Sequence, residues 1–378
     1  MTILDRYLLK LFIKIFVVCF LSFSGLFIVI HLFSNLDELA ALASSEGGWP
    51  ALVQKFYVPR LFDIFDKTAA MMALFAAIFA VTLMQRRREV TAIQASGLSV
   101  RRILRPVLFF SLIIVAVAAV NREWLLPQYR DRLVRTPQDW AGEREMPITM
   151  NEDWQSGVRL RGNHVVVSKR MIDQPDVQLL FELPKAVTRV RAKVATIEPA
   201  TPTAPAGLLL TGVVHPEEID SIASVTDGKS FGVWTSADQN WLYEGQCFVA
   251  CDFDAQKLAY GNKLDDFRTI PELMSDVREP QSSFGRSDRL ALHARLIKPV
   301  LDLTLVLLGL PIVLSQVDRN VFLSAGLCLL VVGVFHLAVT VSHSFGSYRV
   351  LQPAALAAWL PVLVFAPLAV LSMRKLNG

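Results

Sequence analysis

The stretch RRREVTAIQASGLSVRR, residues 86–102, decides the topology of this chain. It places five arginines and one acidic residue, Glu89, around a short helix-like segment between two long apolar runs. Short loops rich in lysine and arginine resist translocation and stay on the cytoplasmic side of a membrane. The stretch therefore predicts a cytoplasmic loop between two membrane spans, and the orientation of every other segment follows from it.

The apolar runs on both sides of this loop predict the spans. Of the 378 residues, 53% are hydrophobic and 19% are charged, a charged share lower than in soluble domains. A spanning helix needs roughly 20 residues, and six runs reach that length when their ends tilt or snorkel. These runs are residues 7–33, 61–85, 103–122, 296–316, 321–342 and 351–373.

The charges beside the six runs favour one topology. The basic flanks all fall on one side: Arg6, Lys10, Lys14, Arg86–Arg88, the arginines at 101–105, Arg319, Arg374 and Lys375. The loops on the other side are acidic or neutral, with Asp37, Glu38 and Glu46 after the first run. Both termini are therefore expected in the cytoplasm, and residues 123–292 are expected to face outward.

The outward segment, residues 123–292, is large enough for a core of its own and has the composition of a β domain. Turn formers separate short runs rich in Val, Ile, Phe and Trp. The predicted strands are residues 158–167, 177–183, 187–197, 208–214, 231–234 and 241–253, followed by an amphipathic helix at about 271–295. We predict an antiparallel sandwich or open jelly-roll.

The predicted fold class is thus an α-helical membrane protein with six transmembrane helices and an all-β jelly-roll domain inserted between helices 3 and 4. Residues 1–122 hold the first three helices and the cytoplasmic segment, residues 123–292 the β domain, and residues 293–378 the last three helices.

No pattern in the sequence predicts an enzyme, a cofactor or a metal site. ASVTDGKS, residues 223–230, ends like a phosphate-binding loop but lacks its first glycine and lies among strands. GxSxG and HExxH patterns are missing, as is the basic, aromatic groove that nucleic acid binding requires. Cys247 and Cys251 lie too far apart on an extended strand for a disulfide, whereas a turn could join them.

Charged residues near the outer ends of the spans allow two interpretations. Asp63 with Lys67, and Lys298 with Asp302, have the spacing of self-neutralising pairs on one helix. They could instead line a cavity that accepts a charged amphiphile. The three arginines of QYRDRLVRT, residues 128–136, fit either a solvated face or a phosphate-binding surface.

The cytoplasmic loop also allows two interpretations. Glu89 could simply offset its arginine neighbours at a helix start. However, the spacing of Val90, Ile93 and Leu98 predicts a short helix on the membrane surface. This helix would present a small protruding surface of apolar and charged side chains. We favour a docking site for a cytoplasmic partner.

Several motifs together resemble one family. They are LDRYLLK at 4–10, RREVTAIQASGLS at 87–99, W-x-x-P-Q at 124–128, ARLIKPVLDLTLVLLGLPI at 294–312 and LSMRK at 371–375. In this order they resemble the LptF/LptG permeases of lipopolysaccharide export over nearly the whole chain. The turn that holds Glu89, Ala95, Ser96, Gly97 and Ser99 is the most specific of these motifs.

The resemblance implies a multi-pass protein of the bacterial inner membrane with a periplasmic jelly-roll. It implies a second LptF/LptG-like permease, a cytoplasmic LptB-like ATPase dimer, an LptC-like periplasmic β protein, and lipopolysaccharide as the cargo. Spans one and five would form the lateral gates. Coupling to the ATPase would fall to Arg87, Arg88, Glu89, Ala95, Ser96, Gly97 and Ser99.

The candidates for binding lipid phosphates are His31, Arg130, Arg132, Arg135 and Lys298. LptG-type members carry a lysine at about the place of His31, and a histidine is a weaker cation at neutral pH, so the headgroup could differ. The sequence leaves open whether the chain is LptF-like or LptG-like. The alternative function is a signalling or mechanotransmitting membrane protein whose β domain binds a partner, and copurified lipid would distinguish the two.

Overall fold

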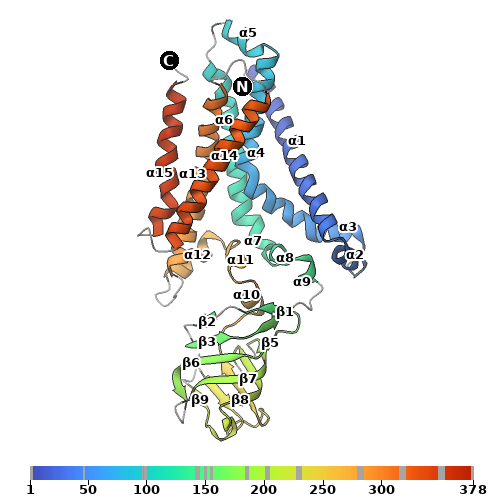
Figure 1. The fold of residues 1–378 in the computed structure, drawn as a ribbon, viewed down its shortest axis with the longest axis vertical. Helices are drawn as coiled ribbons and strands as arrows, with labels where there is room; N and C mark the ends of the chain where they lie inside the picture. Colours follow the sequence, from blue (N-terminus) through green and yellow to red (C-terminus); the bar gives the residue numbers. More distant parts are fainter. Residues whose placement is uncertain are drawn as a thin grey trace. The chain divides into compact units, whose positions relative to one another are not determined.

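The computed structural model describes residues 3–45, 47–95, 97, 100–140, 145–148, 151–153, 156–183, 187–200, 205–226, 232–278, 285–314, 321–347 and 354–375. They form two compact units (Figure 1). The helical unit is Met1–Leu133 with Phe267–Gly378, and the β unit is Val134–Asp266. The predicted interval 123–292 is longer than the β unit, because the segments at both of its ends cluster with the helices.

The helical unit is built from long helices joined by short ones. Its elements are α1 (Ile3–Ser34), α2 (Leu36–Ser45), α3 (Trp49–Leu52), η1 (Val53–Tyr57), α4 (Val58–Arg86), α5 (Glu89–Ala95), α6 (Val100–Val120), η2 (Asn121–Leu125), α7 (Leu126–Gln128), α8 (Arg130–Val134), α12 (Ile270–Arg278), α13 (Gly285–Leu314), α14 (Val321–Ser347) and α15 (Ala354–Lys375). Both η1 and η2 are π-helical turns. A π-helical turn is wider than an α-helical one, is rare, and is frequent at functional sites.

Five helical segments among the described residues are long and apolar enough to cross a membrane. They are Ile3–Ser34, Trp49–Arg86, Arg105–Gln128, Gly326–Gly346 and Ala355–Ser372. The remaining predicted span, residues 296–316, falls on α13, and residues 315 and 316 lie outside the described part of the chain. A multi-pass helical membrane protein with a β domain is therefore confirmed, and six spans remain a prediction.

Helix α4 forms the centre of the helical unit. Its inward face is lined by small residues, including Ala73, Ala76, Ala77 and Ala80, all fully buried. Small side chains allow neighbouring backbones to approach closely, which drives helix packing in lipid. On α13, a Cβ atom at Gly309 would come within 2.5 Å of the Leu74 side chain, so any larger residue there would require Leu74 to shift.

Helix α1 contrasts with α4 because only 6% of its most apolar window is buried. Its 32 residues extend about 48 Å, more than the roughly 30 Å of a bilayer's hydrocarbon core. Exposure of an apolar surface of this size to water is unfavourable. Lipid or the helices of a partner therefore cover it.

The β unit contains one antiparallel sheet of 11 described strands. They are β1 (Glu145–Pro147), β2 (Asn151–Asp153), β3 (Val158–Arg161), β4 (His164–Val166), β5 (Met171–Asp173), β6 (Asp176–Leu183), β7 (Val187–Glu198), β8 (Gly207–His215), β9 (Val225–Thr226), β10 (Gly232–Thr235) and β11 (Gln246–Ala250). The short helices are α9 (Pro137–Trp140), η4 (Ile219–Ser221), α10 (Ala255–Tyr260) and α11 (Asn262–Asp265).

The longest strand, β7, organises the sheet. It pairs with β5 and β6 and also with β8, which continues through β11 and β10 to β9. Alternate residues of these strands, among them Val190, Leu208, Leu210, Val233 and Val249, are fully buried in one core. The all-β character is confirmed, and the jelly-roll connectivity remains a prediction.

Two predicted strands differ from the observed ones. The predicted strand 158–167 is two strands, β3 and β4, which pair with different neighbours. They separate at Gly162, where a Cβ atom would come within 2.8 Å of the Ile172 side chain. Of the predicted strand 241–253, only residues 246–250 pair in the sheet. The thiols of Cys247 and Cys251 are free and buried, so no disulfide joins them.

Candidate functional site

The first candidate site is the short helix α5, which is held at both ends by unusual backbone geometry. Arg88 precedes it with a φ of 58°, and Gly97 follows it with a φ of 81°. A positive φ turns the chain sharply, and it is costly for a residue other than glycine. The chain therefore leaves α4 and turns sharply within two residues before α5 begins at Glu89.

Side-chain contacts fix α5 to two long helices. Val90 is buried against Leu8 of α1 and Met84 of α4. The hydroxyl of Tyr7 donates a hydrogen bond to Glu89 Oε1 at 3.1 Å, and Arg87 Nη1 lies 3.9 Å from the same oxygen. Apolar packing and polar contacts therefore both hold α5 against the long helices.

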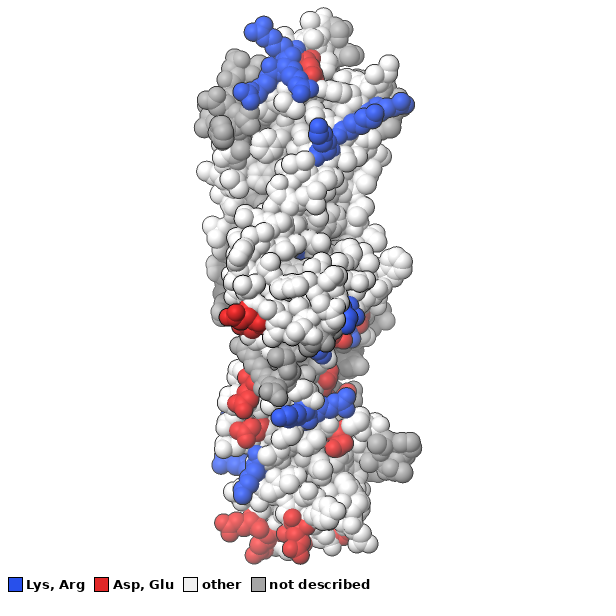
Figure 2. Space-filling model, turned by 90° about the vertical axis from the view of Figure 1, so that its right-hand side faces the viewer, with Lys and Arg blue, Asp and Glu red and all other residues white. Residues whose placement is uncertain are grey.

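The outer face of this segment is accessible. Arg87, Arg88, Ala95 and Gly97 are exposed, and Glu89 is half-buried. On the face drawn in Figure 2, basic side chains gather at the end of the helical unit that carries α5. Ser96 and Ser99, predicted as part of the coupling surface, lie outside the described residues.

A second candidate site is a pocket between α1 and α4. Its volume is about 320 Å³, and its lining consists of Phe23, Phe27, Arg60, Asp63, Ile64, Lys67, Thr68 and Leu133. Lys67 Nζ lies 2.8 Å from Asp63 Oδ2, which is the predicted pair within one helix. The Arg60 guanidinium covers the Phe56 ring at 3.4 Å from its centroid. The pocket thus combines an aromatic wall with two basic side chains and one carboxylate, that of Asp63, which pairs with Lys67.

His31 lies among aromatic side chains near the end of α1. Its ring centroid is 5.7 Å from that of Phe27, 5.6 Å from that of Phe56 and 5.9 Å from that of Tyr57. Its Nδ1 lies 3.4 Å from the Tyr57 hydroxyl. In this structure His31 joins α1 to η1, and its ring is occupied by protein contacts.

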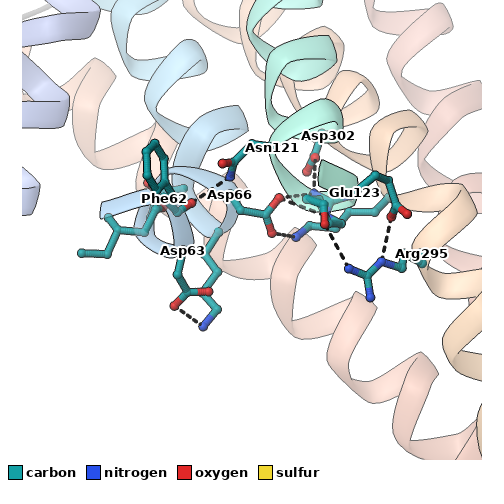
Figure 3. Close-up of polar contacts among 12 residues, drawn as sticks. Phe62, Asp63, Asp66, Asn121, Glu123, Arg295 and Asp302 are labelled. Carbon is teal, nitrogen blue, oxygen red and sulfur yellow. Dashed lines mark hydrogen bonds and ion pairs between the residues drawn. The ribbon is translucent and has the colours of Figure 1, made fainter. Parts of the chain in front are cut away.

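A buried polar network forms the third site (Figure 3). Asp66 of α4 accepts a hydrogen bond from Arg122 Nε of η2 at 2.9 Å and from Lys298 Nζ of α13 at 2.8 Å. Asp302 lies 3.8 Å from Arg122 Nη2. The side chains of Asp66 and Arg122 are only 7% and 6% exposed. Removal of one partner of a pair buried this deeply costs about 3–5 kcal/mol.

Lys298 was predicted either to pair with Asp302 or to contact lipid phosphates, and it pairs with Asp66. Sequence reasoning missed Asp66, Arg122, Glu123 and Arg295. One signal in the sequence could have identified them as candidates: each is an ionisable residue in or near an apolar run. Such residues are costly to bury without a partner. Their pairing could not be found in the same way, since the partners are 56 or more residues apart.

The three predicted arginines have separate surroundings. Arg130 pairs with Glu272 at 3.2 Å, and Arg132 is exposed, with its guanidinium 5.9 Å from the ring centroid of Tyr129. Arg135 belongs to the β unit. Burial acts to raise the pKa of Glu272, but hydrogen bonds from Thr269 and the charge of Arg130 outweigh it and hold the pKa below its usual value.

A comparison with protein families gives one match, to the family described as lipopolysaccharide export system permease LptF/LptG, over residues 6–375. The match covers both units and all three candidate sites. No curated protein matches the chain.

Proposed function

This chain belongs to the LptF/LptG family of lipopolysaccharide export permeases, and from that premise we propose that it extracts lipopolysaccharide from the inner membrane. Permeases of this family are non-catalytic membrane subunits of a transporter. In our proposal the chain pairs with a second permease of the family, and a separate cytoplasmic ATPase dimer supplies the energy. The β unit receives the lipid and passes it to a periplasmic β protein.

The anchoring of α5 is the observation that carries this proposal. The ATPase dimer docks on the exposed face of residues 86–102, and Glu89 with its neighbours forms the contact. Because Val90 packs on Leu8 and Met84, closure of the dimer pushes on α1 and α4 together. Those two helices line the pocket that holds Arg60 and Lys67, so the push reaches a cavity suited to an anionic lipid.

The lipid would enter beside α1. Phe23 and Phe27 offer an apolar wall for acyl chains, whereas Arg60 and Lys67 offer positive charge for phosphates. Arg132 is exposed, and Arg130, Arg135, His31 and Lys298 have protein contacts that a headgroup would have to replace. We therefore rank Arg132 first among the candidate phosphate ligands. Arg60 and Lys67 follow because they line the pocket, although a headgroup would also have to replace their contacts with Phe56 and Asp63.

Glu89→Lys tests the coupling role. The substitution reverses the charge and leaves the Tyr7 hydroxyl and Arg87 facing a cation. We expect ATP-dependent release of lipopolysaccharide from proteoliposomes to fall at least about tenfold, with weaker copurification of the ATPase. Glu217→Lys makes the same charge change on an exposed residue of the β unit and serves as the matched control.

Two outcomes are informative. If Glu89→Gln, which keeps a hydrogen-bond acceptor, retains more activity than Glu89→Lys, the contact with Tyr7 contributes to coupling. Wild-type export and copurification by Glu89→Lys would refute the coupling role of α5.

A further inference from the structure

The β unit is connected to the helical unit by two segments, and polar contacts tie these segments to one another. The chain leaves the helices through η2, α7 and α8, and it returns through α12 to α13. Every contact considered below lies within the helical unit.

Glu123 of η2 holds the returning segment with both carboxylate oxygens. Its Oε1 accepts a hydrogen bond from Arg295 Nε of α13 at 2.9 Å, and its Oε2 accepts one from the Ile270 backbone N–H at the start of α12 at 2.9 Å. Arg295 Nη2 also donates to the Arg122 carbonyl oxygen at 3.3 Å. The Arg295 side chain is only 8% exposed, so water competes little for these contacts.

The beginning of α12 is fixed a second time by Glu272. Its Oε2 accepts a hydrogen bond from the Thr269 backbone N–H at 2.7 Å, and the Thr269 hydroxyl accepts one from the Glu272 N–H at 3.3 Å. This reciprocal pair is a capping box. The other oxygen of Glu272 binds Arg130 of the outgoing segment at 3.2 Å. We call Glu123, Arg295, Glu272 and Arg130 the connection clamp.

Residues of η2 also connect this clamp to α4. Arg122 binds Asp66 of α4, while the next residue, Glu123, binds α12 and α13. Asn121 Nδ2 donates to the Phe62 carbonyl of α4 at 2.9 Å. Three consecutive residues of one turn therefore hold three other elements (Figure 3).

We propose that Glu123 is a positioning residue that makes both connections of the β unit move as one body with α4 and α13. Flexible connections would absorb a rearrangement of the membrane helices before it reached the β unit. Connections held to each other and to two helices transmit that rearrangement. The inference rests on the proposed transport function, because it concerns how lipid passes from the helical unit into the β unit.

Glu123→Gln in the assembled transporter tests the proposal. The glutamine keeps the shape of the side chain but loses its charge and one of the two acceptor oxygens. The transporter is reconstituted in proteoliposomes containing lipopolysaccharide, with a photo-crosslinking amino acid in place of Phe253, which packs at the edge of the β core. The lipid adduct and ATP hydrolysis are measured in the same sample.

We expect the ATP-dependent adduct to fall at least about fivefold while ATP hydrolysis changes less than about twofold. Arg295→Gln is expected to act in the same way. The double variant is expected to lose less than the sum of the two single losses, because both single variants already lose the Glu123–Arg295 ion pair. Arg189→Gln removes an exposed ion pair within the β unit and is the matched control.

Three outcomes contradict the inference or its premise. An adduct at the wild-type level in Glu123→Gln overturns the positioning role. A parallel fall of adduct, ATP hydrolysis and assembled protein also overturns it, because it reports general destabilisation. If Glu123→Gln does not assemble, Glu272→Gln at the exposed end of the clamp decides by the same two readouts. Absence of any adduct in the wild type contradicts the proposed transport function itself.

Discussion

At the scale of single residues, burial controls the chemistry of the thiols in the β unit. Cys247 is fully buried, and burial, assisted by the charge of Asp220, raises the pKa of its thiol to about 12. The pKa of Cys251 is also raised, chiefly by burial. Because the thiolate is the nucleophile, both residues are expected to be inert while the β unit is folded.

Alkylation at pH 8 followed by peptide mass spectrometry checks this. We expect Cys247 in the native protein to react more than about a hundredfold more slowly than in denaturant. Ala223→Cys, at an exposed position of the same unit, provides the reference rate. Equal rates at the two positions would contradict the buried environment of Cys247.

Charged residues show how far residue-level prediction reaches. The pair Asp63–Lys67 forms as its spacing predicts, because both residues are on one uninterrupted helix. Lys298 has the same spacing to Asp302 but contacts Asp66 of another helix. A local spacing indicates which contacts are possible, and packing decides which of them forms.

At the scale of elements, the contact of α4 with α13 depends on Gly309. A Cβ atom there would overlap the fully buried Leu74 side chain, which would have to shift. We expect Gly309→Ala to destabilise the helical unit by about 1–3 kcal/mol, the usual cost of overpacking. Thermal unfolding of the purified chain in detergent measures this as a lower Tm.

Gly333→Ala is the matched control, since Gly333 also lies in an apolar helix and a Cβ atom there would meet no other described heavy atom within 4 Å. It is expected to change stability by less than about 0.5 kcal/mol. Introducing Leu74→Ala beforehand makes room and should reduce the cost of Gly309→Ala. If Gly309→Ala and Gly333→Ala gave the same Tm, the close approach of α4 and α13 would be wrong.

The sequence predicted the end of a helix correctly where apolar residues give way to charged ones. It missed the start of the same helix, where no such change occurs. The predicted run 61–85 ends close to the end of α4 at Arg86. Its start was placed too late, because the helical path continues backward through η1 and α3 to Trp49 despite Pro50 and Pro59. Pro50 occupies the first turn of α3, where a missing N–H costs little, and Pro59 is the second residue of α4, just after the π-helical turn η1.

At the scale of the whole molecule, the distribution of arginines makes a testable prediction of topology. Arg86→Cys lies in the predicted cytoplasmic loop, and Glu244→Cys lies on the exposed surface of the β unit. In intact spheroplasts a membrane-impermeant maleimide is expected to label Glu244→Cys and to leave Arg86→Cys unlabelled, because basic loops stay in the cytoplasm.

Permeabilised cells provide the control, in which both positions should be labelled to the same extent. The opposite labelling pattern in intact spheroplasts would reverse the orientation and remove the ATPase from the α5 side of the membrane.

The sequence alone determined the membrane class, the β character of the inserted domain and the family. Hydrophobicity and β propensity add up along contiguous residues, so they can be read without knowing which segments meet. Only the tertiary structure decided that Asp66, Arg122 and Lys298 share one network and that Glu123 joins the outgoing and returning connections. These contacts join residues that are far apart in the chain. Whether they form depends on which helices pack together and on which charged side chains that packing removes from water.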